Sequence, residues 1–240
     1  MNICIKPSPE ETAVAVALDI SQFIRKNPGA LLCFAAGDTP LPVFRILIDM
    51  QARGDVDLGS VFYVGLDEWV GLGRETKGSC AQVMYDSFYT PARIPESKIC
   101  AWDGLKDPLY EMKRVEAWIS SHGGIALALL GIGMNGHIGF NEPYSKLTTG
   151  TGLVQLDETT KQVSVKYFST PQPVKEGVTI CMGELKKAKK LIMMATGQHK
   201  ASIIKKVAQC QPDEVVPASL MTNHPNIALY IDRWAGELLL

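Results

Sequence analysis

The chain carries little net charge and no long apolar run. Its formal net charge is −1 over 240 residues, so no global field attracts nucleic acid or an anionic membrane surface. No apolar stretch approaches the roughly 18 residues that a membrane span needs, and no basic segment followed by an apolar core opens the chain. We therefore expect a protein that binds neither nucleic acid nor membrane, is not exported, and acts on a small molecule.

Paired-cysteine motifs are also missing. The six cysteines include no CxxC pair, and several of them lie inside apolar runs, where a thiol behaves as a small hydrophobe. Disulfides belong to oxidising compartments, so this usage favours a reducing environment and a cytoplasmic location.

Apolar runs alternate with helical patterns along the chain, which predicts βα units. Ser8, Pro9 and Glu11 supply a side-chain cap, a first-turn proline and a capping-box glutamate, and predict a helix to about Lys26. Further helices are expected from near Pro40 and over 201–207. The predicted strands cover 30–36, 61–64, 98–102, 125–130, 153–156, 177–182, 190–195 and 226–231. This order predicts one α/β domain over residues 1–240, a three-layer α/β/α sandwich with a mainly parallel, Rossmann-like sheet.

The glycine-rich run from Gly131 to Pro143 is the most informative stretch. It follows the apolar run 125–130, which reads as a buried strand, and it places His137 and Glu142 five residues apart on a turn. Both side chains should therefore emerge at the carboxyl end of a strand, where open α/β sheets bind their ligands. Acid–base chemistry, in which Glu142 orients or charges His137, is one interpretation of the pair.

Two other interpretations of this run are weaker. Its glycines match G-x-G-x-x-G, but a nucleotide fingerprint must open a helix after the last glycine, and Pro143 blocks a helix here. Imidazole and carboxylate are also zinc ligands, but the chain has no HExxH pattern and its other histidines are scattered. We expect neither a metal nor an organic cofactor.

A second acidic pair, Asp67 and Glu68, follows the predicted strand 61–64. Adjacent residues of an extended chain point to opposite sides, so at most one of the two carboxylates faces the same crevice. That carboxylate could act as a general base if burial or its neighbours bring its pKa towards the working pH. A solvated acidic loop is an equal alternative.

Two further segments could hold an anion. The turn Gly37-Asp38-Thr39-Pro40 leads from a strand into a helix, whose free N–H groups and dipole attract phosphate. An ordinary turn with Thr39 as helix cap is the plainer interpretation, and the Asp38 carboxylate would repel an anion unless it points away. Lys200 lies near a predicted helix start, where the dipole disfavours a cation unless an anion is bound. A lysine that extends into solvent would explain it equally well.

Taken together, the chain resembles the glucosamine-6-phosphate deaminase (isomerase) family, within a larger group that includes the 6-phosphogluconolactonases. The resemblance extends over nearly the whole length. The Gly136-His-Ile-Gly-Phe-Asn-Glu-Pro143 continuation is its specific part, because lactonases generally lack Phe-Asn-Glu-Pro after the histidine. The matching segments are Gly37–Pro40, Leu66–Gly71, Gly131–Pro143, Thr196–Lys200 and Pro217–Ser219.

The resemblance implies that an amino-sugar 6-phosphate is opened, isomerised and deaminated to a ketose 6-phosphate and ammonia, without a metal or organic cofactor. By family analogy, Asp67 moves a proton from C2 to C1 of the open-chain sugar. His137, held by Glu142 and Asn135, assists ring opening. The 6-phosphate is held by Lys200 and the turn Gly37, Asp38 and Thr39, with Lys166 where an arginine is usual.

Three residues depart from the family pattern. Asn135 stands where glucosamine-6-phosphate enzymes usually have Asp, and its amide oxygen could still accept the imidazole N–H but brings no negative charge. This feature is closer to the galactosamine-6-phosphate deaminase branch. Asp38 replaces a glycine or small residue, and Lys166 offers a point charge in place of the planar fork of arginine.

We therefore expect an amino-hexose 6-phosphate deaminase, with galactosamine slightly preferred over glucosamine. The alternatives are a 6-phosphogluconolactonase-like hydrolase, a deglycase for a related phosphorylated adduct, and a non-catalytic sugar-phosphate sensor. A sensor should carry an output module, and no basic DNA-binding extension is visible at either end. For assembly we expect a monomer or a small homo-oligomer.

Overall fold

The computed structural model describes residues 1–168, 170 and 172–240. Within these residues the largest element is a seven-stranded sheet in which every neighbouring pair is parallel. The strand order is β1 (Asn2–Lys6), β10 (Ile227–Asp232), β9 (Lys190–Ala195), β6 (Ile125–Gly131), β2 (Leu31–Phe34), β3 (Phe62–Gly65) and β5 (Ile99–Cys100). The predicted parallel α/β sheet is confirmed.

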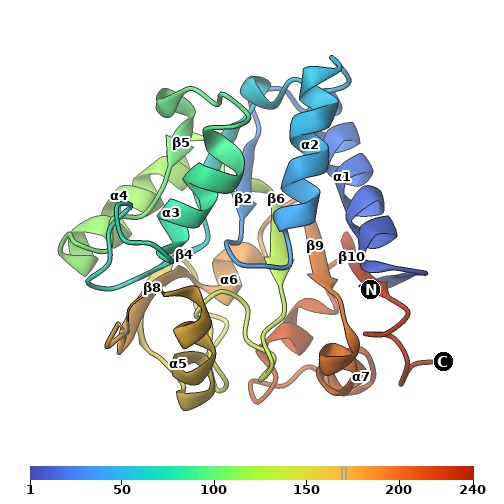
Figure 1. Ribbon diagram of the computed structural model, residues 1–240. Helices are drawn as coiled ribbons and strands as arrows, with labels where there is room; N and C mark the ends of the chain where they lie inside the picture. The colour runs from blue at the N-terminus through green and yellow to red at the C-terminus, as the bar shows by residue number, and fades with distance from the viewer. Residues whose placement is uncertain (169, 171) are drawn as a thin grey trace.

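Both faces of this sheet are covered, which explains why its central strands read as continuous apolar runs. Side chains alternate along β2, so that Leu31 and Cys33 enter one core while Leu32 and Phe34 enter the other. The helices are α1 (Pro9–Lys26), α2 (Leu41–Ala52), α3 (Cys80–Met84), α4 (Pro108–Ser121), α5 (Glu158–Ser164), α6 (Met182–Leu185) and α7 (Ala201–Gln209). Figure 1 shows α1 and α2 side by side on one face. Helices α4, α6 and α7 pack on the opposite face, which completes three layers.

The helix starts follow the local sequence to different degrees. The Ser8 hydroxyl accepts a hydrogen bond from the backbone N–H of Glu11, as a capping serine should, and α1 covers Pro9–Lys26 as predicted. Thr39 does not cap α2: that helix begins after Pro40 and has no side-chain cap. The helices in the described part of the chain include none with the length and apolar character of a membrane span.

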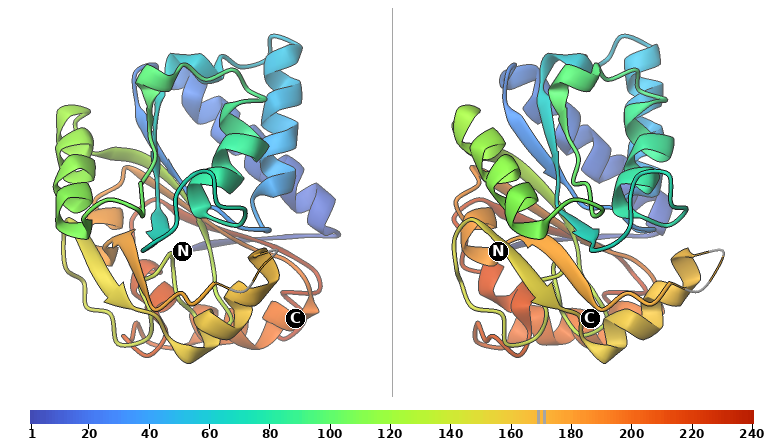
Figure 2. Two further views of the ribbon diagram at one scale, coloured as in Figure 1. Left: turned by 60° about the vertical axis from the view of Figure 1, so that its left-hand side comes forward. Right: turned by 90° about the vertical axis from the view of Figure 1, so that its left-hand side faces the viewer.

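A second, smaller sheet differs from the expectation of one mainly parallel sheet. It joins β4 (Asp67–Trp69), β8 (Glu176–Ile180) and β7 (Thr151–Gln155) in antiparallel pairs. Figure 2 shows its yellow and orange strands below the green helix α4, against which β7 packs. The strands expected near 153–156 and 177–182 therefore exist but do not extend the main sheet.

The first strand was not predicted. Residues Asn2–Lys6 form β1, which pairs with β10 from the far end of the chain, so that the N-terminal segment closes one edge of the sheet. The carboxyl ends of β2, β3, β6 and β9 meet at one edge, because parallel strands all run the same way. The segments that follow these four strands contain most of the predicted site residues.

Candidate active site

A cleft of about 660 Å³ lies at this edge of the main sheet. Seven of the nine predicted site residues line it: Gly37, Asp38, Thr39, Asp67, His137, Lys166 and Lys200. The other two, Asn135 and Glu142, lie behind His137 and contact it there. The structure therefore brings together residues that are more than a hundred positions apart in the sequence.

The turn after β6 is shaped by its glycines. Gly136 has a φ of +84°, a left-handed conformation that a residue with a side chain rarely adopts. A Cβ on Gly133 would lie 2.2 Å from Cδ2 of His137, so only glycine leaves room for the imidazole ring. The segment returns without forming a helix, as Pro143 predicted, and it presents His137 to the cleft.

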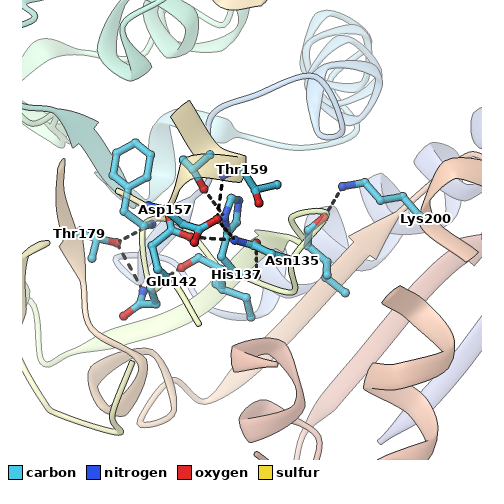
Figure 3. A network of polar contacts seen from close by, with 12 residues as sticks. Asn135, His137, Glu142, Asp157, Thr159, Thr179 and Lys200 are labelled. Atoms are coloured by element: carbon cyan, nitrogen blue, oxygen red, sulfur yellow. Dashed lines mark hydrogen bonds and ion pairs between the residues drawn. The ribbon is translucent and has the colours of Figure 1, made fainter. Parts of the chain in front are cut away.

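His137 is held through one ring nitrogen. Its Nδ1 lies 3.2 Å from Oε2 of Glu142 and 3.0 Å from Oγ1 of Thr160. A carboxylate at this distance favours the tautomer that carries a proton on Nδ1, which leaves Nε2 without that proton. Figure 3 shows His137 and Glu142 close together. The ring is thus oriented for proton exchange through Nε2.

Asn135 is placed as predicted, but its expected hydrogen bond is wrong. Its Oδ1 accepts from the backbone N–H of His137 at 3.2 Å and does not contact the imidazole. Its Nδ2 donates to Glu142 Oε2 at 3.1 Å and to Asp157 Oδ1 at 3.4 Å. Asn135 therefore holds the Glu142 carboxylate, which contacts the imidazole, and does not hold the imidazole itself.

Glu142 is surrounded by donors. Besides Asn135 and the imidazole, the backbone N–H of Asp157 donates to its Oε1 at 3.3 Å. Burial disfavours the ionised carboxylate, but hydrogen bonds from His137, Thr160 and Asn135, with the nearby imidazole, outweigh burial and hold the pKa of Glu142 below its ordinary value. Glu142 is therefore a permanent negative charge beside His137.

Asp67 lies on the other side of the cleft, at the first position of β4. Burial raises the pKa of Asp67 to about 7, while a hydrogen bond from the Cys80 thiol acts in the opposite direction. A carboxylate whose pKa lies near 7 exchanges its proton readily at neutral pH, as a general base must.

Glu68 points away from the cleft, as the alternation of an extended chain predicts. Its Oε1 accepts from the backbone N–H groups of Trp69 and Cys80 at 2.8 and 2.9 Å, and its Oε2 accepts from that of Ala81 at 2.7 Å. Burial raises its pKa to about 8 despite these three bonds, and the neighbouring Asp67 acts in the same direction. Glu68 thus fixes the start of α3 behind the cleft.

Lys200 marks the other end of the cleft. It precedes α7, and its Nζ donates to the backbone carbonyl of Ile132 at 2.6 Å. Burial lowers the pKa of Lys200 to about 8, and the nearby positive charge of Lys166 lowers it further in the same direction. Gly37 faces the same space with a φ of +115°. An anion bound here would stabilise the protonated form of Lys200.

Asp38 and Lys166 form an ion pair across the cleft mouth. The Lys166 Nζ lies 2.7 Å from Asp38 Oδ2, and both side chains are more than half exposed. Asp38 therefore does not act alone as a repulsive charge, because the positive charge of Lys166 lies beside it. In the described part of the chain, no group of three His, Cys, Asp or Glu side chains could hold a metal ion.

Sequence reasoning missed Thr160, Asp157 and Cys80. Thr160 is buried and touches the imidazole, and Cys80 lines the cleft and contacts Asp67. The Asp157-Glu-Thr start of α5 carries a recognisable N-cap signal, since Asp157 Oδ1 accepts from the Thr159 N–H at 2.8 Å. That signal places a helix but not its contact with His137.

The doubly covered parallel sheet, with a titratable carboxylate and an oriented histidine at its carboxyl edge, defines an α/β enzyme. The chain belongs to the family described as Glucosamine-6-phosphate isomerases/6-phosphogluconolactonase, whose model matches residues 8–229.

Similar proteins cover the whole chain. It is 34% identical to a glucosamine-6-phosphate deaminase of Thermoanaerobacter pseudethanolicus, over 100% of this chain and 95% of that protein. The deaminase of Halothermothrix orenii is also 34% identical, over 100% of both chains. Among solved structures, a monomeric glucosamine-6-phosphate deaminase has a TM-score of 0.95 at 30% identity, covering 99% of this chain and 100% of that one. A 6-phosphogluconolactonase of Trypanosoma brucei has a TM-score of 0.81 at 17% identity, covering 100% and 98%, and shares the fold.

Proposed function

We propose that the protein is an amino-hexose 6-phosphate deaminase that releases ammonia and a ketose 6-phosphate. The carrying observation is that Asp67, with a pKa of about 7, and His137, tied to an ionised Glu142, face one cleft from different strands. Acid–base chemistry at two neighbouring carbons needs two such separate groups. The names of the deaminase relatives support the same assignment.

In this proposal His137 opens the sugar ring. Its Nε2, free of the contacts that hold Nδ1, exchanges a proton with the ring oxygen and the C1 hydroxyl. Glu142 stays ionised and stabilises the imidazolium form whenever it arises. Asn135 keeps the Glu142 carboxylate in place through its Nδ2.

Asp67 then moves the proton that isomerises the sugar. Its carboxylate takes the proton from C2 of the open-chain aldose and returns one to C1, while one amine proton passes to the C1 oxygen, which leaves a C1 hydroxyl and an imine at C2. Water adds to that carbon and ammonia leaves, so that one water is consumed for each ammonia and ketose 6-phosphate formed. A base with a pKa near 7 suits the first step, because it is substantially ionised and still able to return the proton.

The opposite end of the cleft would receive the 6-phosphate. Lys200 supplies a buried positive charge, and the turn Gly37, Asp38 and Thr39 lies beside the start of α2. Lys166 would turn from Asp38 towards the phosphate or share the two. We also propose that residues 1–240 act as one domain in the cytoplasm, as a monomer or a small homo-oligomer; the monomeric relative favours the monomer.

Two lines of argument favour different sugar epimers as the substrate. The names of the relatives favour glucosamine 6-phosphate, whereas Asn135, in place of the usual Asp, favours galactosamine 6-phosphate. An amide at this position brings no charge of its own to the network behind His137, which alters how that network is stabilised. On this residue we keep the slight preference for the galactosamine form.

Ammonia release tests the proposal. The purified protein is incubated with glucosamine 6-phosphate and, separately, with galactosamine 6-phosphate, and ammonia is measured with a coupled enzyme. Release from one or both supports the proposal and ranks the epimers by kcat/KM, while no ammonia from either refutes it. Hydrolysis of 6-phosphogluconolactone is measured in parallel, because that reaction needs no base at C2 and would identify the lactonase alternative.

A further inference from the structure

Asp157 lies at the junction of three elements behind His137. Its Oδ1 accepts both the backbone N–H of Thr159, at 2.8 Å, and the Nδ2 of Asn135, at 3.4 Å. Its own backbone N–H donates to Glu142 at 3.3 Å. Figure 3 shows Asp157, Asn135 and Glu142 in one network of polar contacts. One residue therefore touches the helix α5, the amide of Asn135 and the acceptor of the imidazole.

These contacts fix which way the Asn135 amide points. Its oxygen faces the backbone N–H of His137, and its nitrogen faces the oxygens of Glu142 and Asp157. The reversed amide would set an N–H donor against the N–H of His137 and an oxygen against two carboxylates, so every one of these bonds would be lost. The orientation follows from the partners alone.

The same contacts predict what a carboxylate at position 135 would do. It would keep the bond from the His137 N–H, but its second oxygen would lie against Glu142 and Asp157, and no donor would separate the three carboxylates. Like charges at hydrogen-bond distance in a partly buried site destabilise one another strongly. An amide at position 157 would relieve part of this conflict, because it removes one of the three charges while its oxygen can still accept the Thr159 N–H.

Asp157 also controls a second partner of the imidazole. As the N-cap of α5 it fixes the first turn of that helix, which carries the buried Thr160. The Thr160 hydroxyl lies 3.0 Å from Nδ1 of His137. Displacing this turn would therefore move both the hydroxyl and the backbone donor to Glu142.

We propose that Asp157 is a positioning residue for His137, and that Asn135 and Asp157 form an exchangeable amide–carboxylate pair. The negative charge that position 135 lacks is thus supplied from the start of α5. The catalytic part of this inference rests on the proposed function, since it assumes that His137 exchanges protons with the substrate.

A double-mutant cycle tests the pair. We expect Asn135→Asp to lower kcat for ammonia release by about 30-fold and Asp157→Asn by about 5-fold, both with little change in KM. Asn is as good an N-cap as Asp, so Asp157→Asn keeps α5 in place and isolates the charge. The double variant Asn135→Asp/Asp157→Asn should recover to within about 5-fold of wild type, whereas independent effects would multiply to about 150-fold.

The control is Glu158→Gln, which removes a neighbouring, largely exposed carboxylate that pairs with Lys161 and not with Asn135. It should leave kcat within about twofold of wild type, as surface changes usually do. A double variant no better than the product of the single effects overturns the inference. So does an Asn135→Asp protein as active as wild type.

A second readout separates this inference from the proposed function. Urea unfolding is measured for wild type, the two single variants and the double variant. Asn135→Asp should lower the urea concentration at the unfolding midpoint, and adding Asp157→Asn should restore it. If no variant releases ammonia, including wild type, the proposed function fails while the unfolding cycle still decides the pairing. If Asn135→Asp does not fold and the double variant does not fold either, the pairing is refuted.

Discussion

The surroundings on the two sides of the cleft shift the pKa of a carboxyl group in opposite directions. Asp67 is half-buried and lies beside another acid, Glu68, and desolvation of its carboxyl group raises its pKa to about 7. Glu142 is buried, yet hydrogen bonds and the adjoining imidazole hold its pKa below the ordinary value. Glu68 shows that hydrogen bonds alone do not decide the outcome, because three backbone N–H groups leave its pKa raised. The difference is a neighbour that can become positive.

This contrast assigns different tasks to the two sides. A carboxyl group with a raised pKa can give and take a proton near neutral pH, whereas one with a lowered pKa remains a fixed charge. The expected division is therefore a proton-carrying Asp67 and a His137 whose charged form is stabilised by Glu142. The following measurements test this division and the charges at the other end of the cleft.

Asp67→Asn should have the largest effect. The amide fits the same space but cannot accept the C2 proton, so kcat for ammonia release should fall about 10³-fold, while KM changes little. Steady-state ammonia assays check this, and urea unfolding verifies that the variant is folded. A variant that keeps more than a tenth of the wild-type kcat would show that another group removes the proton.

The free energy of unfolding should separate the two carboxylates by sign. The pKa of Asp67 is higher in the folded than in the unfolded chain, so wild type loses stability as pH rises from about 4 to about 7. At pH 8, Asp67→Asn should therefore be more stable than wild type by roughly 2 kcal/mol. The pKa of Glu142 is lower in the folded than in the unfolded chain, so its ionised carboxylate stabilises the fold at any pH above the unfolded-state pKa. Glu142→Gln should therefore be less stable than wild type at pH 8 by roughly 2 kcal/mol.

Urea unfolding at pH 5 and pH 8 measures both differences. The gain in Asp67→Asn should shrink at pH 5, where folded Asp67 is mostly protonated and only part of the pH-dependent loss has accumulated. Equal shifts of one sign in both variants would contradict the contrast.

The pH dependence of activity should show the ionisation of Asp67 in kcat and that of Lys200 in KM. Below pH 7 the kcat should fall about tenfold per pH unit, because Asp67 becomes protonated and no longer acts as a base. Above pH 8 the KM should rise, because Lys200 loses the charge that holds the phosphate. Initial rates measured from about pH 5.5 to about pH 9.5, in steps of about half a pH unit, provide both curves. A kcat independent of pH between 5.5 and 7 would exclude Asp67 as the base.

Asp38→Asn should have the smallest effect. It removes the charge that holds Lys166 and keeps the size of the side chain, so Lys166 becomes free to meet the phosphate. The KM should fall by about threefold with kcat unchanged, since exposed ion pairs have modest energies. Lys161→Met, which breaks a comparable exposed pair with Glu158, is the control. An increase in KM would mean that Asp38 itself contacts the substrate.

Local signals predicted much of the fold. The cap at Ser8 defined α1, and the apolar run of β9 was predicted with its observed bounds. β1 was missed because a five-residue, partly exposed strand gains its stability from β10, more than two hundred residues away. The small sheet was misjudged for the same reason, since β4 pairs with a strand over a hundred residues further on.

The site divides in the same manner. Asp67, His137 and Lys200 could be named because each follows an apolar strand, and parallel strands end at one edge. The orientation of the Asn135 amide could not be predicted, because it depends on Asp157 from another element. Thr160 was missed because nothing in its own sequence neighbourhood shows that it meets His137.

The register of the pairing between β4 and β8 determines which acidic side chain faces the cleft. Asp67 stands opposite Thr179, and Glu68 stands opposite Val178. Thr179 in turn accepts a hydrogen bond from the Phe140 N–H, on the segment that carries His137. A slip of one residue between β4 and β8 would turn every β4 side chain over and exchange Asp67 for Glu68. Which acid meets the substrate is thus decided by strand register as much as by the residue at position 67.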